Sequence, residues 1–205
     1  QLGKTLAKEW KVPHFEGQHH EAHFAAILAE RKLTDHNKVL GIIWDGTGHG
    51  SDGHTWGGEF FDYTDQQICR IAHIDYFQVL SNDRMATDNR LCALSLASPE
   101  QVSELQDAFQ QREWDFYSKI LAKPTQLTSS MGRIFDAVAY LANVSTSNTY
   151  EGQSAILLEQ DAKRMLSQSG NFEPYSFEVK GGLISIKQLI AEVFHDRKIN
   201  PTVIS

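Results

Sequence analysis

Cysteine, basic charge and long apolar runs are all scarce in this sequence. Cys69 and Cys92 are its two cysteines and form no CxxC pair, so we expect no disulfide framework, and we expect both to be buried small residues rather than nucleophiles. Nineteen basic residues against 26 acidic ones give a formal charge of −7, which offers no basic face to nucleic acid or to an anionic membrane. No apolar run approaches the roughly 20 residues that span a bilayer. We therefore expect a cytoplasmic protein with no nucleic acid partner and no membrane partner.

The rest of the composition is typical of a folded globular protein. Hydrophobic residues make up 41% of the chain and aromatic residues 10%. A chain of 205 residues is long enough for one large domain or for two small lobes that share a core. The sequence contains no repeat and no low-complexity linker, so one domain is the simplest expectation.

The spacing of apolar residues predicts where helices and strands lie. Residues 39–44 form a nearly continuous apolar run that Asp45 and Gly46 stop abruptly, which predicts a buried strand ending in a turn. Residues 55–63 and 69–77 are also predicted to be extended, and three consecutive strands indicate an antiparallel meander. Further short strands are predicted over residues 14–18 and 175–179. Helices are predicted over residues 1–11, 19–31, 83–96, 99–121, 131–142, 150–167 and 185–196.

The histidines of Gln18-His19-His20-Glu21-Ala22-His23 indicate a metal site. Residues four apart on a helix share a face, so His19 and His23 can offer two imidazoles to one ion while His20 points elsewhere. The pattern is not the zincin H-E-x-x-H, because Phe24 stands where the second histidine belongs. Asp45 could add an oxygen ligand, and two imidazoles with one carboxylate suit iron or zinc. The alternative is that the three histidines only cap a helix.

The stretch Asp45-Gly46-Thr47-Gly48 predicts a phosphate-binding turn. A strand that ends in a glycine-bearing turn exposes backbone N–H groups, which can hold phosphates without a lysine. Trp56-Gly57-Gly58-Glu59 on the next predicted strand completes this region. The alternative is an ordinary hairpin turn, since Asp-Gly is among the commonest turn dipeptides.

Two predicted helix starts are further candidates for nucleotide contacts. Ser129-Ser130 precedes a helix whose free N–H groups favour an anion, and Asp136 could accept hydrogen bonds from ribose hydroxyls. Arg133 and Asp136 could instead form only a surface ion pair. In Tyr150-Glu151-Gly152-Gln153, Gly152 would let a ligand approach closely, although helix capping explains this stretch equally well.

Taken together, these motifs resemble the carbamoyltransferase domain of the HypF family in their order and spacing. Q-H-H-E-A-H is followed by I-I-W-D-G-T-G-H-G-S-D-G-H-T-W-G-G-E-F, then by S-S-M-G-R-I-F-D-A-V-A and Y-E-G-Q, so the resemblance covers nearly the whole chain. The domain is similar to the tRNA threonylcarbamoyl-transfer proteins. The resemblance therefore implies an α/β fold of the actin-like ATPase type, with duplicated RNase H-like lobes.

The resemblance also implies a metal site and the residues that form it. In the wider family an H-x-x-x-H pair binds metal, which matches His19 and His23 here. In HypF proteins an aspartate at the position of Asp45 joins them, so these three are the expected catalytic residues and metal ligands. The implied ion is iron or zinc, with magnesium as a further candidate.

A nucleotide site follows from the same resemblance. Gly46, Thr47 and Gly48 would lie near the phosphates of ATP or carbamoyl-adenylate, and Asp136 and Gly152 near its ribose. The family makes the cyanide ligands of nickel–iron hydrogenase from carbamoyl phosphate and ATP. The implied reaction passes the carbamoyl group from carbamoyl-adenylate to the C-terminal cysteine of the partner protein HypE. Two alternatives are a noncatalytic nucleotide-binding scaffold of the actin-like superfamily and an O-carbamoyltransferase that acts on a small molecule.

The chain departs from the family in the modules it contains. The acylphosphatase-like module, the zinc-finger region and the carbamate-activating domain are not in this sequence, and neither is a later glycine-rich segment with a further metal-binding aspartate. We therefore expect a partial carbamoyltransferase domain, with a first lobe over about residues 1–80. Residues from about 81 to 205 would form a helical region and the start of a truncated second lobe. We expect this fragment to be inactive alone, with an exposed apolar sheet face that favours self-association.

Overall fold

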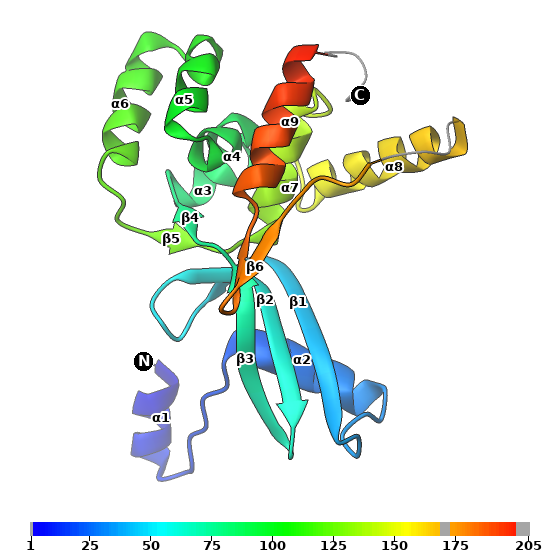
Figure 1. The fold of residues 1–205 in the computed structure, drawn as a ribbon. Helices are drawn as coiled ribbons and strands as arrows, with labels where there is room; N and C mark the ends of the chain where they lie inside the picture. Colours follow the sequence, from blue (N-terminus) through cyan, green and yellow to red (C-terminus); the bar gives the residue numbers. More distant parts are fainter. Residues whose placement is uncertain (1, 169–172, 200–205) are drawn as a thin grey trace.

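The computed structural model describes residues 2–168 and 173–199, which contain one seven-stranded sheet, with one helix along its long strands and most of the other helices gathered at one end (Figure 1). The strands are β1 (Lys38–His49), β2 (Thr55–Thr64), β3 (Gln67–Ile74), β4 (Phe77–Gln78), β5 (Leu127–Thr128), β6 (Glu178–Lys180) and β7 (Leu183–Ser185). The helices are α1 (Leu2–Trp10), α2 (His19–Glu30), α3 (Asn82–Met85), α4 (Asn89–Leu96), α5 (Pro99–Val102), the 3-10 helix η1 (Ser103–Ala108), α6 (Gln111–Leu121), α7 (Met131–Leu141), α8 (Gln153–Gln168) and α9 (Lys187–Ile199). No helix within the described ranges is long and apolar enough to cross a membrane.

Strands β1, β2 and β3 form the predicted antiparallel meander. β2 lies between the other two, so Phe61 is opposite Gly41 on one side and Arg70 on the other. Helix α2 covers one face of the meander, and its Phe24 ring lies so close to Gly41 that a Cβ there would come within 2.6 Å of the ring. The core between helix and sheet consists of Phe24, Leu28, Ile43, Trp56, Phe61 and Tyr63.

Strand β1 does not end where the sequence predicted. It continues past Asp45 to His49, with a shift in its pairing with β2 between Trp44 and Gly48. Such a bulge accommodates extra residues while the strand goes on. The predicted turn at Asp45 is therefore wrong, as is its alternative, an ordinary hairpin turn, and the aspartate and its glycines lie on a bulge within a strand.

The same strand is also less buried than predicted. Leu40, Ile42 and Trp44 are 60%, 51% and 53% exposed, whereas Ile43 lies in the core. Because side chains alternate along a strand, an apolar run can have one face in the core and the other in solvent. The exposed apolar face agrees with the expectation of an uncovered sheet, while self-association stays a prediction.

Several other predicted elements are shorter, divided or displaced. No strand forms over residues 14–18, and the short strand predicted over 175–179 is reduced to β6, with the unpredicted β7 as its partner. The helix predicted over 83–96 is divided into α3 and α4. The helix predicted over 99–121 is divided into α5, η1 and α6, because Phe109 is extended and Gln110 begins α6 with a capping box to Glu113.

A second core lies among the helices that follow the meander. Helices α4, α7 and α9 pack around Leu91, Leu94, Ile134, Leu141, Ile190 and Phe194. β5 joins the sheet beside β2, with Thr128 opposite Thr55, and leads directly into α7. This connection places the start of α7 against the bulge of β1.

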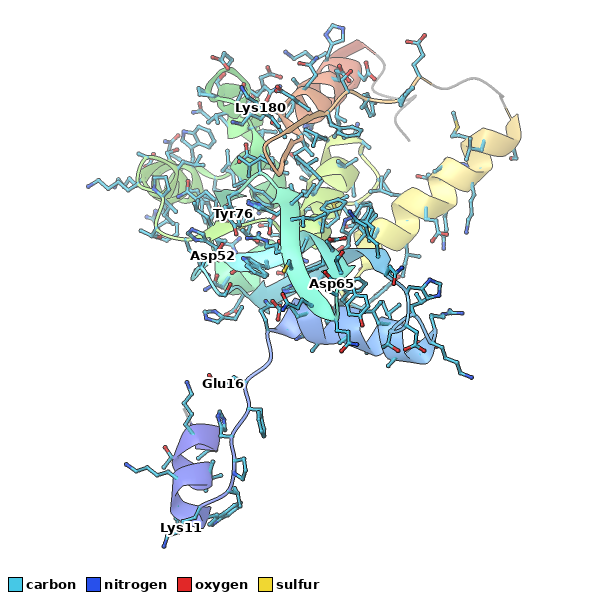
Figure 2. The ribbon with its side chains drawn as sticks, turned by 60° about the horizontal axis from the view of Figure 1, so that its bottom comes forward. Lys11, Glu16, Asp52, Asp65, Tyr76 and Lys180 are labelled. Atoms are coloured by element: carbon cyan, nitrogen blue, oxygen red, sulfur yellow. The ribbon has the colours of Figure 1, made fainter. Side chains whose placement is uncertain are left out.

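Helix α1 stands apart from the rest of the chain, with no buried residue (Figures 1 and 2). The segment from Lys11 to Glu16 carries it away from the sheet (Figure 2). It does not contribute to the site described next.

Candidate metal centre and nucleotide cleft

The three predicted metal ligands lie together. The Nε2 atom of His19 lies 3.1 Å from Nε2 of His23 and 3.2 Å from Oδ2 of Asp45. One ligand atom from each of the three side chains lies within 4.8 Å of the others. α2 supplies the two imidazoles and the bulge of β1 supplies the carboxylate, so the packing of Phe24 on Gly41 brings ligands 26 residues apart to one point.

This geometry fits a transition-metal ion. Two imidazole nitrogens bound to one zinc ion at about 2.1 Å, with about 95–110° between the bonds, are themselves about 3.1–3.4 Å apart. The observed separation of His19 and His23 Nε2 is at the lower end of that range. The His19 side chain is 50% exposed and that of Asp45 24%, so the outer side of the site is open to a further ligand.

His20 is on the buried side of α2 and is not one of the three clustered ligands, but its ring nitrogen approaches the same carboxylate. It is fully buried and its ring packs against Trp56, with the ring centroids 5.7 Å apart. Burial lowers the pKa of His20, with the negative charges of Glu59 and Asp45 opposing the shift. His20 Nε2 lies 3.9 Å from Asp45 Oδ2.

Helix α7 holds the bulge that bears Asp45. Ser130, the N-cap of α7, donates from Oγ to the carbonyl oxygen of Gly46 at 2.7 Å and accepts from the N–H of Arg133. Glycine allows this close approach. A Cβ on Gly57 would come within 2.4 Å of the Asp45 carbonyl oxygen, and one on Gly132 within 2.9 Å of the Gly46 Cα.

A buried carboxylate, Glu59, ties the meander to the start of α7. It accepts hydrogen bonds from the N–H groups of Gly57 and Gly58, from the hydroxyl of Ser129 and, at 2.5 Å, from Nε of Arg70. Although Glu59 belongs to the W-G-G-E stretch, the sequence did not indicate this role, because its partners come from three separate segments.

The outer end of this network joins Arg70 to Asp52 and Tyr76. The Arg70 guanidinium lies 3.9 Å from the centre of the Trp56 ring, and Tyr76 donates to Asp52 at 2.5 Å. Burial raises the pKa of Asp52, but hydrogen bonds from Tyr76, His54 and Trp56 outweigh it and lower the pKa to about 2. Burial and the bond to Asp52 raise the pKa of Tyr76 to about 12. Figure 2 shows Asp52 and Tyr76 side by side.

A cleft of about 750 Å³ begins at the residue after Asp45. Gly46, Thr47 and Gly48 line it, and their binding of phosphate stays a prediction. The remainder of the wall comes from α3 and the segment before it, from β5, from the Arg133 side chain and from residues 148–151. This volume is within the usual range for small-molecule sites.

The two predicted ribose contacts do not line this cleft. Asp136 is 3% exposed, forms an ion pair with Arg133 at 3.0 Å and accepts from Asn148 at 2.7 Å. Burial raises the pKa of Asp136, against the effect of Arg133. Gly152 has a φ of +76° and open space around its Cβ position, next to the cleft residue Glu151. Ribose binding by Asp136 and Gly152 stays a prediction. The charged residues that line the cleft are Asp83, Arg133 and Glu151, and the sequence analysis assigned no nucleotide contact to any of them.

The two cysteines have different surroundings. Cys92 is fully buried, as predicted, and burial raises the pKa of its thiol. Cys69 is exposed, so the prediction that both are buried is wrong for this residue. Cys69 lies on β3, whose side chains also alternate between the core and solvent.

Comparison with known proteins identifies the family. A family model described as "Carbamoyltransferase, Kae1-like Domain, second subdomain" matches residues 41–205. The chain belongs to the HypF carbamoyltransferase family. Carbamoyltransferase HypF of Synechocystis is 33% identical over 89% of this chain, and a HypF homolog of Cupriavidus necator is 30% identical over 95% of it.

Solved HypF structures share the fold. A crystal structure of full-length HypF in a phosphate- and nucleotide-bound form has a TM-score of 0.79 and 32% identity over 97% of this chain. Another, of HypF from T. kodakarensis, has the same TM-score and 28% identity. The match confirms the predicted α/β fold of the actin-like, Kae1-like type. The chain spans 28% of the Synechocystis HypF, 51% of the Cupriavidus homolog and 26% of the nucleotide-bound HypF chain.

Proposed function

We propose that this chain is the part of a longer HypF protein that transfers a carbamoyl group from carbamoyl-adenylate to the C-terminal cysteine of a HypE-type partner during hydrogenase maturation, and that it is inactive alone. His19, His23 and Asp45 would hold an iron or zinc ion, and the adjoining cleft would hold the nucleotide. The observation that carries the proposal is the shared bulge of β1: Asp45 is a member of the ligand cluster, and the next three residues line the cleft. An ion and the phosphate end of a nucleotide would therefore lie next to each other.

The residues around the cleft suit an adenylate. The Arg133 guanidinium, which is also paired with Asp136, would provide positive charge for the phosphate. In the reaction, the partner's thiolate sulfur forms a bond to the carbamoyl carbon, and the bond from that carbon to the phosphate oxygen breaks. AMP then leaves with the electron pair. A divalent ion bound beside the cleft would supply Lewis acidity to this step.

The acceptor thiol is expected to come from outside this chain. Cys92 is buried and Cys69 lies on β3, and neither cysteine lines the cleft or belongs to the ligand cluster. Formation of carbamoyl-adenylate from carbamoyl phosphate and ATP is assigned in this proposal to other modules of the family.

Metal binding and carbamoyl transfer test the proposal together. Purified protein is titrated with Zn²⁺ and Fe²⁺, then mixed with carbamoyl-adenylate and a HypE C-terminal peptide whose mass is followed. We expect one tight metal equivalent in the isolated chain, and a carbamoylated peptide only when the chain is part of a full-length HypF protein. The H19A/H23A variant should lose both, whereas H36A, which removes an exposed histidine elsewhere, should lose neither.

Other outcomes favour the alternatives. Nucleotide binding that survives H19A/H23A, with no transfer under any condition, would favour a noncatalytic scaffold. Carbamoylation of a small hydroxyl compound in place of the peptide would favour an O-carbamoyltransferase.

A further inference from the structure

His20 is the middle one of the three histidines, and its hydrogen bonds determine which of its ring nitrogens carries the hydrogen. Gln18 accepts from the Glu21 N–H through Oε1, at 3.0 Å, so its amide orientation is set. Its Nε2 then donates to the His49 carbonyl and to Nδ1 of His20, each at 3.1 Å. Because Nδ1 of His20 accepts, the ring hydrogen is assigned to Nε2.

This Nε2–H is buried and has no hydrogen-bond partner among the described residues. Oδ2 of Asp45 lies 3.9 Å away, which is too long for a hydrogen bond. The same oxygen is 3.2 Å from Nε2 of His19. A buried donor without a partner is costly, so its presence beside a candidate ligand calls for a reason.

The His20 ring cannot move to meet Asp45, but the carboxylate can turn toward the ring. Trp56 packs against the ring on one side, and on another Gly48 is so close that a Cβ would lie 2.4 Å from His20 Cε1. The terminal torsion of an aspartate is soft. The Gly46 N–H donates to Oδ1 of Asp45 at 2.6 Å and holds that oxygen, so a small rotation about it would bring Oδ2 within reach of the fixed donor.

We propose that His20 is a positioning residue that donates from Nε2 to the Asp45 carboxylate and holds it in the orientation in which it binds the metal ion. The three histidines then have two functions: the outer pair bind the ion and the middle one orients the third ligand. Ligand carboxylates are commonly held by such hydrogen bonds, and the loss of one typically weakens metal binding by about 10–100-fold. This inference rests on the proposed metal site.

The test compares two substitutions of His20 that differ in the donor. H20M fills a similar volume without an N–H, whereas H20Q keeps an N–H at a similar reach. Zinc affinity is measured by competition with a chelating dye, and the stability of the metal-free protein by urea unfolding. H36A is the control for a histidine outside the site.

Zinc affinity should fall in H20M, while the urea midpoint of unfolding should not. We expect H20M to bind zinc about 10–100-fold more weakly than the wild type, and H20Q to recover most of that loss. The metal-free H20M protein should unfold at a urea concentration close to that of the wild type, because the substitution removes an unpartnered buried donor together with the acceptor for Gln18 Nε2. If His20 served only packing, its replacement would lower the unfolding midpoint, and zinc affinity would not depend on whether the new side chain has an N–H.

Each contrary result has a distinct meaning. If H20M binds zinc as tightly as the wild type while H19A/H23A does not bind, the role of His20 is wrong and the metal site stands. Equal losses in H20M and H20Q, or a loss matched by a lower unfolding midpoint, would also overturn the inference. If the wild type itself binds no zinc, the proposed metal site fails and this role fails with it.

Discussion

Replacing Gly48 with alanine should disturb the metal centre, whereas the same change at Gly46 should not. A Cβ on Gly48 would lie 2.4 Å from His20 Cε1 and 2.9 Å from Cδ2 of His19. A Cβ on Gly46 would have no neighbour closer than 3.8 Å, which is ordinary van der Waals contact. Neither glycine has a positive φ, so alanine fits the backbone at both positions and only the space differs.

The contacts at Gly48 set the size of the effect. His20 is buried behind Gly48 and backed by Trp56, so the strand and the helix must separate to admit the methyl group. Overpacking of this kind costs about 1–3 kcal/mol, and we expect G48A to lower the free energy of unfolding by about 2 kcal/mol. Because His19 must also shift, zinc affinity should fall at least about tenfold. G46A should change stability by less than about 0.5 kcal/mol.

Urea unfolding of the metal-free proteins and zinc titration with a competing dye check both numbers. The two variants differ by one methyl group, two residues apart on the same strand, so each serves as the control for the other. If G48A and G46A were equally stable and bound zinc equally well, the histidine rings could not be packed against Gly48 as described.

Three further predictions concern the cysteines and the acidic network. Cys69 should react with Ellman's reagent at once and Cys92 only on unfolding, since burial raises the pKa of the Cys92 thiol; C69S should abolish the fast phase. The lowered pKa of Asp52, about 2 against 3.8, means that its stabilisation is present above about pH 4 and lost as the pH falls through 2. D52N should therefore be less stable than the wild type at pH 7, by of order 1 kcal/mol after solvent screening, with the gap closing near pH 2 in urea titrations. E59Q leaves the Arg70 guanidinium without its buried charged partner and should lower the free energy of unfolding by about 3 kcal/mol. An E59Q protein as stable as the wild type would contradict the role of Glu59 in joining the meander to α7.

The parts of the site that could be predicted depend on local spacing. His19 and His23 are one helical turn apart, and that spacing alone places both imidazoles on one face. The third ligand was different. Asp45 had no spacing that linked it to the histidines, and its inclusion rested mainly on the resemblance to HypF.

The errors arose where a distant partner decides the outcome. The sequence around Asp45 reads as a turn, but pairing of Gly48 with Trp56 and of His49 with Thr55 keeps the strand going. A glycine signal cannot distinguish a turn from a bulge, because both accept the same residues.

Burial was equally hard to predict for individual polar residues. Arg133 and Asp136 do form the i,i+3 pair that was the alternative to a ribose contact, yet it is not a surface pair: Asp136 is buried and Arg133 lines the cleft, because α7 is packed on the sheet and on α4 and α8. Glu59 is a second example, because its position on a strand does not indicate that four groups donate hydrogen bonds to it. Such side chains acquire a role only from the segments that fold against them.

The bulge of β1 gives the site a property that a turn would not. Asp45 and Gly46 are consecutive, and one hydroxyl, Ser130 Oγ, holds the Gly46 carbonyl at the start of α7. Gly57 and Gly132 remove the side chains that would otherwise keep these segments apart. A nucleotide that moved this backbone would therefore move a metal ligand by a similar amount, with no flexible loop between them to absorb the shift. Linkage between two binding sites is reciprocal. If the nucleotide changes the affinity for the ion by some factor, the ion changes the affinity for the nucleotide by the same factor.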